Sequence, residues 1–486
     1  MTFSTLTFFI FLALVFSLYW MVRYRSAQNL LLVAASYAFY SWWDWRFCGL
    51  MLLSSVTDYL VGIGLGRARR STSRLMLLIL SLVVNLGLLG CFKYFGFFYH
   101  SLTVALDSIG WTVTPLSLKI ILPVGISFYT FQTLSYTIDV YRGQFEPTRR
   151  IVDFFAFVSF FPQLVAGPIE RARSLLPQFS QVRSFDRVEA ADGCRQILWG
   201  LFKKMVLADN LSIIVDAAYQ AKDISVVSGP EWSFATICFA FQIYCDFSAY
   251  SDIAIGTARL FRIRLSRNFA YPYFSQDPGE FWRRWHISLS TWFRDYVYIP
   301  LGGSLTRPLH RAWNVLLTFV ISGLWHGPSW NFVIWGAIHG LAVAVVSGHR
   351  SGSKRGPDDK PANTPNRFTW VGMFGTFAFV CAAWVFFRAR TLGDSFMIFS
   401  RIGSDIVNFD SIAAVLGRVL DAEQYLPVLL HLIGFILVEW WQRGRDHALN
   451  LTSWPRAARW VIYTALVWDI IYFGTHEQGA FIYFQF

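Results

Sequence analysis

The chain has 486 residues, of which 55% are hydrophobic and 18% aromatic, while only 15% are charged. Soluble domains carry about 25% charged residues, so this composition excludes a soluble globular protein and indicates a polytopic membrane protein. The net charge of +12 comes from short basic clusters between apolar spans. That pattern is typical of cytoplasmic loops, and no nucleic-acid partner is expected.

The opening stretch, MTFSTLTFFIFLALVFSLYWMVRYR, lacks a basic leader and a small-residue cleavage site, so we predict a first transmembrane helix rather than a removed signal peptide. Arg23 and Arg25 follow it, and four arginines lie between residues 67 and 74. Both clusters indicate the cytoplasmic side of the membrane.

Two later segments contain helix-breaking residues. In residues 118–140, Pro123 and Gly125 predict a kink or a re-entrant entry. Residues 152–169 end in FFPQLVAGPI, whose prolines and glycine favour a re-entrant helix pair lining a cavity over a straight span. A kinked but ordinary span is the alternative. The polar residues 172–189 predict a cytoplasmic loop with amphipathic helices.

Residues 232–260 place charge inside an apolar span, in FQIYCDFSAYSDIAIG. Carboxylates at membrane depth are costly and need partners. We expect Asp246, Tyr250 and Asp252 to be structural and to pair with arginines of the core. Four more arginines lie between residues 259 and 267, again on the predicted cytoplasmic side.

The densest mixture of charged and apolar residues begins at Asp277, in DPGEFWRRWHISLSTWFRDYVY. Asp277 can cap a helix, and Pro278 suits its first position. We predict one continuous helix here, with Trp285 and Tyr296 on a shared face. No face of this helix would be purely apolar, so it suits the membrane interface or the wall of a polar cavity.

The following segment reads as a broken membrane helix. Residues 312–326 are almost continuously apolar and would span roughly 22 Å as a helix. Gly327-Pro328 interrupts the helix, and Ser329 can cap a new one. His326 is therefore predicted at a helix break inside the membrane, where protein or trapped water must satisfy the backbone.

Toward the C-terminus, the polar residues 348–367 predict a hydrophilic loop, and three further apolar spans follow. We expect an all-α polytopic membrane protein with about 11–13 transmembrane and re-entrant helices, forming a single domain over residues 1–486 with a catalytic core at about 118–348. No metal site is expected, because HExxH, clustered cysteine–histidine spacing and Asp-rich loops are missing from the sequence. A GxSxG elbow is missing as well, which argues against a serine hydrolase.

Several motifs together resemble one family, the membrane-bound O-acyltransferases, and within it the branch of the bacterial alginate O-acetyltransferase membrane components. The resemblance covers most of the chain. It rests on FFPQLVAGPIER at 160–171, YCDFSAYSDIAIG at 244–256, EFWRRWHISLSTWFRDYVYIPLGG at 280–303, GLWHG at 323–327, WVFFRA at 384–389 and the ending FIYFQF.

The resemblance implies a ring of tilted helices around a central funnel, in the bacterial inner membrane. It implies acetyl transfer from cytoplasmic acetyl-CoA, which acts as a substrate and not as a permanently bound cofactor. His326 is then the expected general base and His286 the second catalytic candidate, while Arg283 and Arg284 are expected to contact the donor phosphates. The acceptor would be an exopolysaccharide, alginate or cellulose-like, and the partner a periplasmic or secreted acetyltransferase.

Other readings stay open at this point. The chain could acylate peptidoglycan, teichoic acid or a lipid instead, or it could be a transporter whose broken helices form a substrate site. A transporter would be expected to show internal repeats, and none is found in the sequence.

Overall fold

The computed structural model describes residues 1–112, 121–165, 167–351, 369–405, 407–421, 425–475 and 481–482. The elements that it describes are all helical. The chain divides into two compact units: residues 1–197 with 253–266, and residues 198–252 with 267–486. Most of the predicted hydrophilic loop at 348–367 lies outside the described residues.

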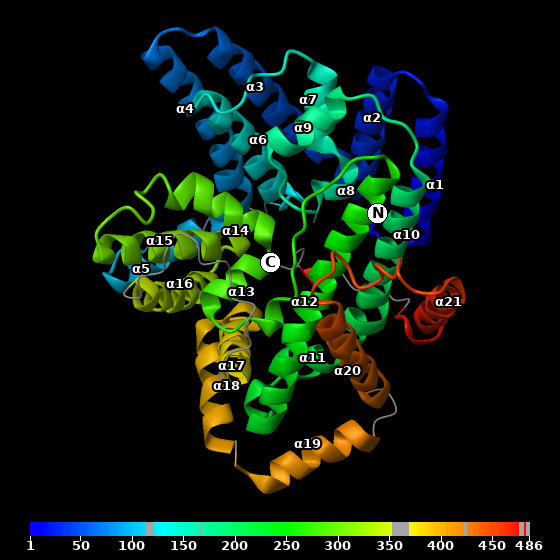
Figure 1. Ribbon diagram of the computed structural model, residues 1–486. Helices are drawn as coiled ribbons and strands as arrows, with labels where there is room; N and C mark the ends of the chain where they lie inside the picture. The colour runs from blue at the N-terminus through cyan, green and yellow to red at the C-terminus, as the bar shows by residue number, and fades with distance from the viewer. Residues whose placement is uncertain are drawn as a thin grey trace. The chain divides into compact units, whose positions relative to one another are not determined.

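The described residues of the first unit form helices that follow one another along the chain (Figure 1). In the membrane no water is present to bond the backbone, and a helix pairs its backbone N–H and C=O groups within one segment. Apolar runs of the sequence therefore form helices. The elements are α1 (Leu6–Met21), α2 (Arg25–Asp44), η1 (Trp45–Phe47), α3 (Cys48–Arg67), α4 (Ser71–Leu89), the π-turn η2 (Gly90–Tyr94), α5 (Phe95–Ser108), α6 (Ile126–Tyr141), α7 (Ile151–Ser159), α8 (Phe161–Leu164), α9 (Ala172–Ser180) and most of α10 (Arg187–Phe202).

The predicted membrane character is confirmed. Among the described residues, five helical stretches are long and apolar enough to cross a membrane, and α1 is a shorter apolar helix. Large apolar side chains such as Leu14 and Leu80 lie exposed on these helices, as expected for a surface that faces lipid. The finer expectation of 11–13 embedded segments includes broken helices below that length and stays a prediction. The five stretches are Arg25–Arg67, Ser71–Ser108, Trp330–Gly348, Trp370–Arg388 and Tyr425–Gln442.

Two predicted irregularities of the first unit are found, one of them in a different form. Pro123 and Gly125 do not kink α6 but precede it, because Gly125 takes a left-handed conformation (φ 75°) at its start. A Cβ on Gly125 would lie 2.8 Å from the carbonyl oxygen of Leu164, so a larger residue would clash there. The FFPQL segment breaks at Phe160 between α7 and α8, so no straight span forms.

The second unit contains the stretch that begins at Asp277 and is also helical (Figure 1). The single helix α12 (Gly229–Leu260) continues from this unit into the first. Its other elements are the π-turn η3 (Lys203–Ala208), α11 (Asp209–Tyr219), η4 (Ile224–Val226), η5 (Pro272–Phe274), α13 (Pro278–Arg284), α14 (Ile287–Phe293), the π-turn η6 (Arg294–Tyr298), α15 (Pro308–His326), α16 (Trp330–Ser351), α17 (Thr369–Arg388), α18 (Leu392–Asp405), α19 (Phe409–Asp421), α20 (Tyr425–Gln442) and α21 (Arg456–Phe473).

Helices α15 and α16 pack side by side as a close hairpin (Figure 1). A Cβ on Gly323 would lie 2.1 Å from the carbonyl oxygen of Phe332, and one on Gly336 would lie 2.3 Å from that of Phe319. Small residues allow helices in membranes to approach this closely. The helix break predicted at Gly327-Pro328 is the turn of this hairpin, because α15 ends at His326 and α16 begins at Trp330.

Asp246 and Asp252 of α12 have cationic partners, but these are lysines and not the expected arginines. Lys203 Nζ lies 2.6 Å from a carboxylate oxygen of Asp252, and Lys204 Nζ lies 2.9 Å from Asp246 and 2.8 Å from Asp209. Both lysines are 2% exposed. A π-helical turn over Lys203–Ala208 presents the two consecutive lysines to α12, and buried charges require such pairing.

Candidate active site

The first half of the central stretch does not form the predicted continuous helix. The cap is as expected, since Asp277 accepts a hydrogen bond from the Glu280 backbone N–H at 2.9 Å. The helix α13 ends at Arg284, however, and His286 takes a left-handed conformation (φ 42°) before α14 begins. A non-glycine residue in this region is strained and needs support from its surroundings.

The support comes from residues 268–270, which supply the hydrogen bonds that the broken helix loses. The Ala270 backbone N–H donates to the Arg284 carbonyl oxygen at 2.9 Å, and the Ile287 N–H donates to the Asn268 carbonyl oxygen at 2.9 Å. The chain therefore turns sharply at His286 without leaving these backbone groups unpaired.

Asn268 also fixes the imidazole of His286. The backbone N–H and the hydroxyl of Ser288 donate to Asn268 Oδ1 at 3.3 and 2.9 Å, and His286 Nδ1 lies 3.1 Å from the same oxygen. Because Oδ1 can only accept, Nδ1 carries the proton in this arrangement. Nε2 is then the unprotonated nitrogen, and it has no hydrogen-bond partner among the described residues.

His326 is the last residue of α15 and is 3% exposed. Three aromatic rings surround its imidazole: Trp325 and Trp335 with ring centroids at 5.0 Å, and Phe387 at 5.5 Å. Trp335 and Phe387 come from α16 and α17, so the hairpin turn and α17 together enclose the histidine. This enclosure excludes bulk water from the imidazole and strengthens polar interactions made there.

The two predicted catalytic histidines belong to one aromatic cluster. The ring of Trp325 lies 6.0 Å from that of His286 and 5.0 Å from that of His326, centroid to centroid. On its other side, His286 meets the edge of Phe247 at 4.7 Å. His286 itself is 0% exposed. The structure thus brings together two residues that are 40 positions apart in the sequence.

A third histidine of the stretch, His339, has a different environment. Its Nδ1 accepts a hydrogen bond from the indole N–H of Trp282 at 3.2 Å, and its ring lies 5.0 Å from that of Trp335. This hydrogen bond joins α16 to α13, which indicates a structural role for His339.

A cavity of about 590 Å³ lies next to this cluster, lined by residues of α13 to α16. Its walls are mostly apolar, but they include Arg283, Arg294 and several hydroxyl groups. Ser322, one of its lining residues, lies one helical turn before His326 on α15. The hydroxyl groups come from Ser290, Thr291, Tyr298, Thr318 and Ser322.

The two predicted donor-binding arginines differ in their surroundings. Arg283 is exposed, lines the cavity and forms no ion pair with the described residues. Arg284 is paired with Glu280, with Nη2 to Oε1 at 2.6 Å, and does not line the cavity. Of the two guanidinium groups, only that of Arg283 is therefore available to a ligand in this cavity.

Sequence reasoning missed Asn268 and Trp325 as members of the site. Trp325 stands directly before His326 in the GLWHG motif, and this adjacency in the sequence could have identified it as a neighbour of the histidine. Asn268 acts on His286 across 18 residues, and only a fold can show such a contact.

Comparisons with known proteins show the family of the chain. The profile of the membrane-bound O-acyltransferase family matches residues 148–386, which contain both catalytic candidates and the cavity. The chain is 36% identical to a probable alginate O-acetylase, AlgI, of Pseudomonas putida over the full length of both chains. It is 42% identical to its namesake in Azotobacter vinelandii, over 83% of this chain and 78% of the relative.

A relative with another named substrate is also similar. The peptidoglycan O-acetyltransferase of Helicobacter pylori is 30% identical, over 94% of this chain and 91% of the relative. Relatives of different acceptor specificity therefore match nearly the whole chain.

Proposed function

The chain belongs to the membrane-bound O-acyltransferase family, and on that premise we propose that it moves acetyl from cytoplasmic acetyl-CoA to a hydroxyl group of an exported polysaccharide. The single observation that carries the proposal is the shared aromatic cluster of His286 and His326, next to a cavity with an unpaired arginine. We place the protein in the bacterial inner membrane, where a cytoplasmic donor and an exported acceptor can both be reached.

The proposed chemistry is acyl transfer with general-base help. The acceptor oxygen attacks the thioester carbonyl while His326 takes the hydroxyl proton. The carbon–sulfur bond then breaks, coenzyme A leaves as a thiolate that is reprotonated, and the acetyl ester remains on the acceptor. His286, whose Nδ1 proton is held by Asn268, presents its free Nε2 within the same cluster and orients the second reactant.

The enclosure of His326 by Trp325, Trp335 and Phe387 supports this assignment. Acetyl-CoA is a reactive thioester, and an enzyme that transfers its acetyl group must protect it from hydrolysis. A dry aromatic wall around the base favours a bound hydroxyl over water as the attacking group.

We assign the donor phosphates to Arg283. Arg283→Gln should raise the KM for acetyl-CoA by about tenfold, because a charge-assisted hydrogen bond is worth about 1.5–3 kcal/mol. Arg284→Gln is the matched control with the same loss of charge, and it should change KM less because Arg284 is already held by Glu280. Steady-state kinetics in proteoliposomes measures both, and an unchanged KM in both variants would end the phosphate role.

For the acceptor we propose a polysaccharide such as alginate or acetylated cellulose. The similarity to the named alginate O-acetylases favours this class, while the Helicobacter pylori relative makes peptidoglycan the second candidate. Transfer of labelled acetyl from acetyl-CoA in proteoliposomes, with each polymer supplied in turn, tests both. A chain that moves no label to any hydroxyl acceptor would contradict the proposed reaction.

We also propose a periplasmic or secreted acetyltransferase as the partner that completes the transfer. The described residues form membrane-type helices and short connections, with little surface on which to grip a polymer. The purified chain alone should therefore acetylate polysaccharide slowly, and adding periplasmic extract of the same cells should raise the rate. A single purified chain that works at full rate would refute the need for a partner.

A further inference from the structure

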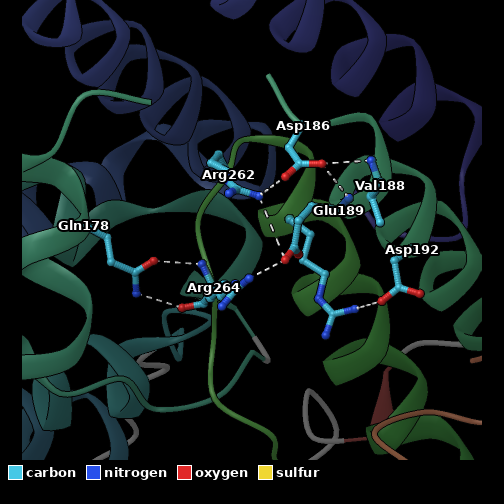
Figure 2. A network of polar contacts seen from close by, with 8 residues as sticks. Gln178, Asp186, Val188, Glu189, Asp192, Arg262 and Arg264 are labelled. Atoms are coloured by element: carbon cyan, nitrogen blue, oxygen red, sulfur yellow. Dashed lines mark hydrogen bonds and ion pairs between the residues drawn. The ribbon is translucent and has the colours of Figure 1, made fainter. Parts of the chain in front are cut away.

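The first unit contains a polar cavity that the proposed reaction does not use. Its volume is about 370 Å³, and four arginines and one glutamate are among its lining residues. Figure 2 shows polar contacts made by several of its lining residues, with Arg262 and Arg264 reaching toward carboxylates. The charged lining residues are Arg183, Glu189, Arg259, Arg262 and Arg264.

Three of the arginines are neutralised by carboxylates of α10 and its cap. Arg262 is bonded to Asp186 at 2.6 Å, Arg264 to Glu189, and Arg259 to Asp192. The backbone N–H groups of Glu189 and Val188, together with Arg262, hold the pKa of Asp186 below its usual value. Its carboxylate is therefore charged at neutral pH, and these pairs form a fixed frame (Figure 2).

Arg183 is different from the other three. It is 8% exposed, and its Nη2 donates to Oδ1 of Asn29, which is a neutral amide. Its Nε and Nη1 are buried and have no hydrogen-bond partner among the described residues. Asp153, whose charge interacts with that of Arg183, accepts a hydrogen bond from Asn29 at 2.8 Å. The cavity thus contains a buried cation with two unused donor atoms.

The surroundings of Arg183 fix its position but do not satisfy its donors. The guanidinium carbon lies 5.6 Å from the ring centre of Tyr19 and 5.7 Å from that of Phe179. These cation–π contacts hold a planar group in place. A buried cation with free N–H groups is costly unless an anion completes it.

The cavity lies at the arginine-rich end of the first unit. Arg25, the first residue of α2, donates to the Ser180 carbonyl oxygen at 2.6 Å. Tyr19, at the end of α1, donates to the carbonyl oxygen of Phe261 at 3.1 Å. Because basic turns mark the cytoplasmic side, this end faces the cytoplasm at the level of the lipid headgroups.

We propose that this cavity binds a phosphate group, held by Arg183 and framed by the paired arginines. Guanidinium groups recognise phosphate through several parallel hydrogen bonds, and a tetrahedral oxyanion can accept from more than one of them. Two molecules could supply it from the cytoplasmic side: an anionic phospholipid through its headgroup, or a cytosolic nucleotide. The site stands independently of acetyl transfer.

The experiment uses the purified full chain with one probe for each source. Adenosine 5′-monophosphate, which lacks the 3′-phosphate of coenzyme A, is titrated by calorimetry, and retention of phosphatidylglycerol against phosphatidylcholine is measured by native mass spectrometry from nanodiscs. For whichever of the two probes binds, Arg183→Gln should weaken binding by at least about tenfold. Arg70→Gln removes the same charge at an exposed position outside the cavity and should leave binding unchanged.

A second pair of variants covers the case in which Arg183→Gln fails to fold. Ser184 is an exposed lining residue of the cavity, so a charge placed there does not disturb the core. Ser184→Asp should weaken binding and Ser184→Lys should strengthen it. A response limited to phosphatidylglycerol identifies the lipid headgroup, and a response limited to adenosine 5′-monophosphate identifies a nucleotide. The proposal is overturned if neither probe binds. It is also overturned if the affinity for the bound probe is the same in the monodisperse Arg183 and Ser184 variants as in the unmodified protein.

Discussion

Replacing His326 by alanine should lower acetyl transfer by about 10²–10⁴, the usual contribution of a general base. His326→Gln should fail to a similar extent, because glutamine keeps polarity and approximate size but cannot take the proton. Both variants should insert and fold, since the turn after His326 is formed by Gly327, in extended conformation, and by Pro328. The measurement is transfer of labelled acetyl in proteoliposomes, together with monodispersity after detergent extraction.

His339→Gln provides the matched control in the same helical hairpin. His339 is also fully buried, and it accepts one hydrogen bond from Trp282, which a glutamine oxygen can accept instead. Its substitution should therefore cost much less transfer than that of His326. If His326→Gln retains near-normal transfer while folded, His326 is structural, and the base must be sought first at His286.

The parts of the site that were predictable from the sequence follow local rules. The cap at Asp277 and the helix break at Gly327-Pro328 were both predicted, because capping and the loss of a backbone donor depend on neighbouring residues alone. The all-helical membrane fold was predictable for the same reason, since long apolar runs have few other ways to satisfy their backbone.

The remaining features depend on contacts between distant residues. Nothing in WRRWHIS signals that the helix breaks at His286, because Asn268 and Ala270 supply the replacement hydrogen bonds from another segment. The cost of burying Asp246 and Asp252 was evident, but the choice of Lys203 and Lys204 as their partners was not. That choice depends on a π-helical turn, which periodicity does not predict.

Asn268 should be a positioning residue for His286, and its substitution is the second large effect that we expect. Asn268→Ala removes the acceptor that holds the proton on Nδ1 and two hydrogen bonds to Ser288. A misplaced catalytic group can cost about 10² in rate, so transfer should fall by about that factor. Asn268→Asp keeps an acceptor for Nδ1 and should retain more activity.

The pH profile separates positioning from a structural loss. A carboxylate beside His286 stabilises the protonated imidazole. In the Asn268→Asp variant His286 therefore becomes protonated at a higher pH than in the unmodified protein. The acid limb of the Asn268→Asp profile should therefore move upward in pH, which a packing defect would not cause. Circular dichroism and monodispersity serve as the folding controls.

A double variant then decides through which residue Asn268 acts. If it acts through His286, adding Asn268→Ala to His286→Ala should cause little further loss, because coupled residues are not additive. If the two substitutions instead lower the transfer rate by factors that multiply, Asn268 acts independently of His286. Its role would then be through Ser251, because the Asn268 amide donates to the Ser251 hydroxyl oxygen at 3.2 Å. The strained backbone at His286 would in that case be a feature of helix packing between α12 and α14, and not part of the catalytic arrangement.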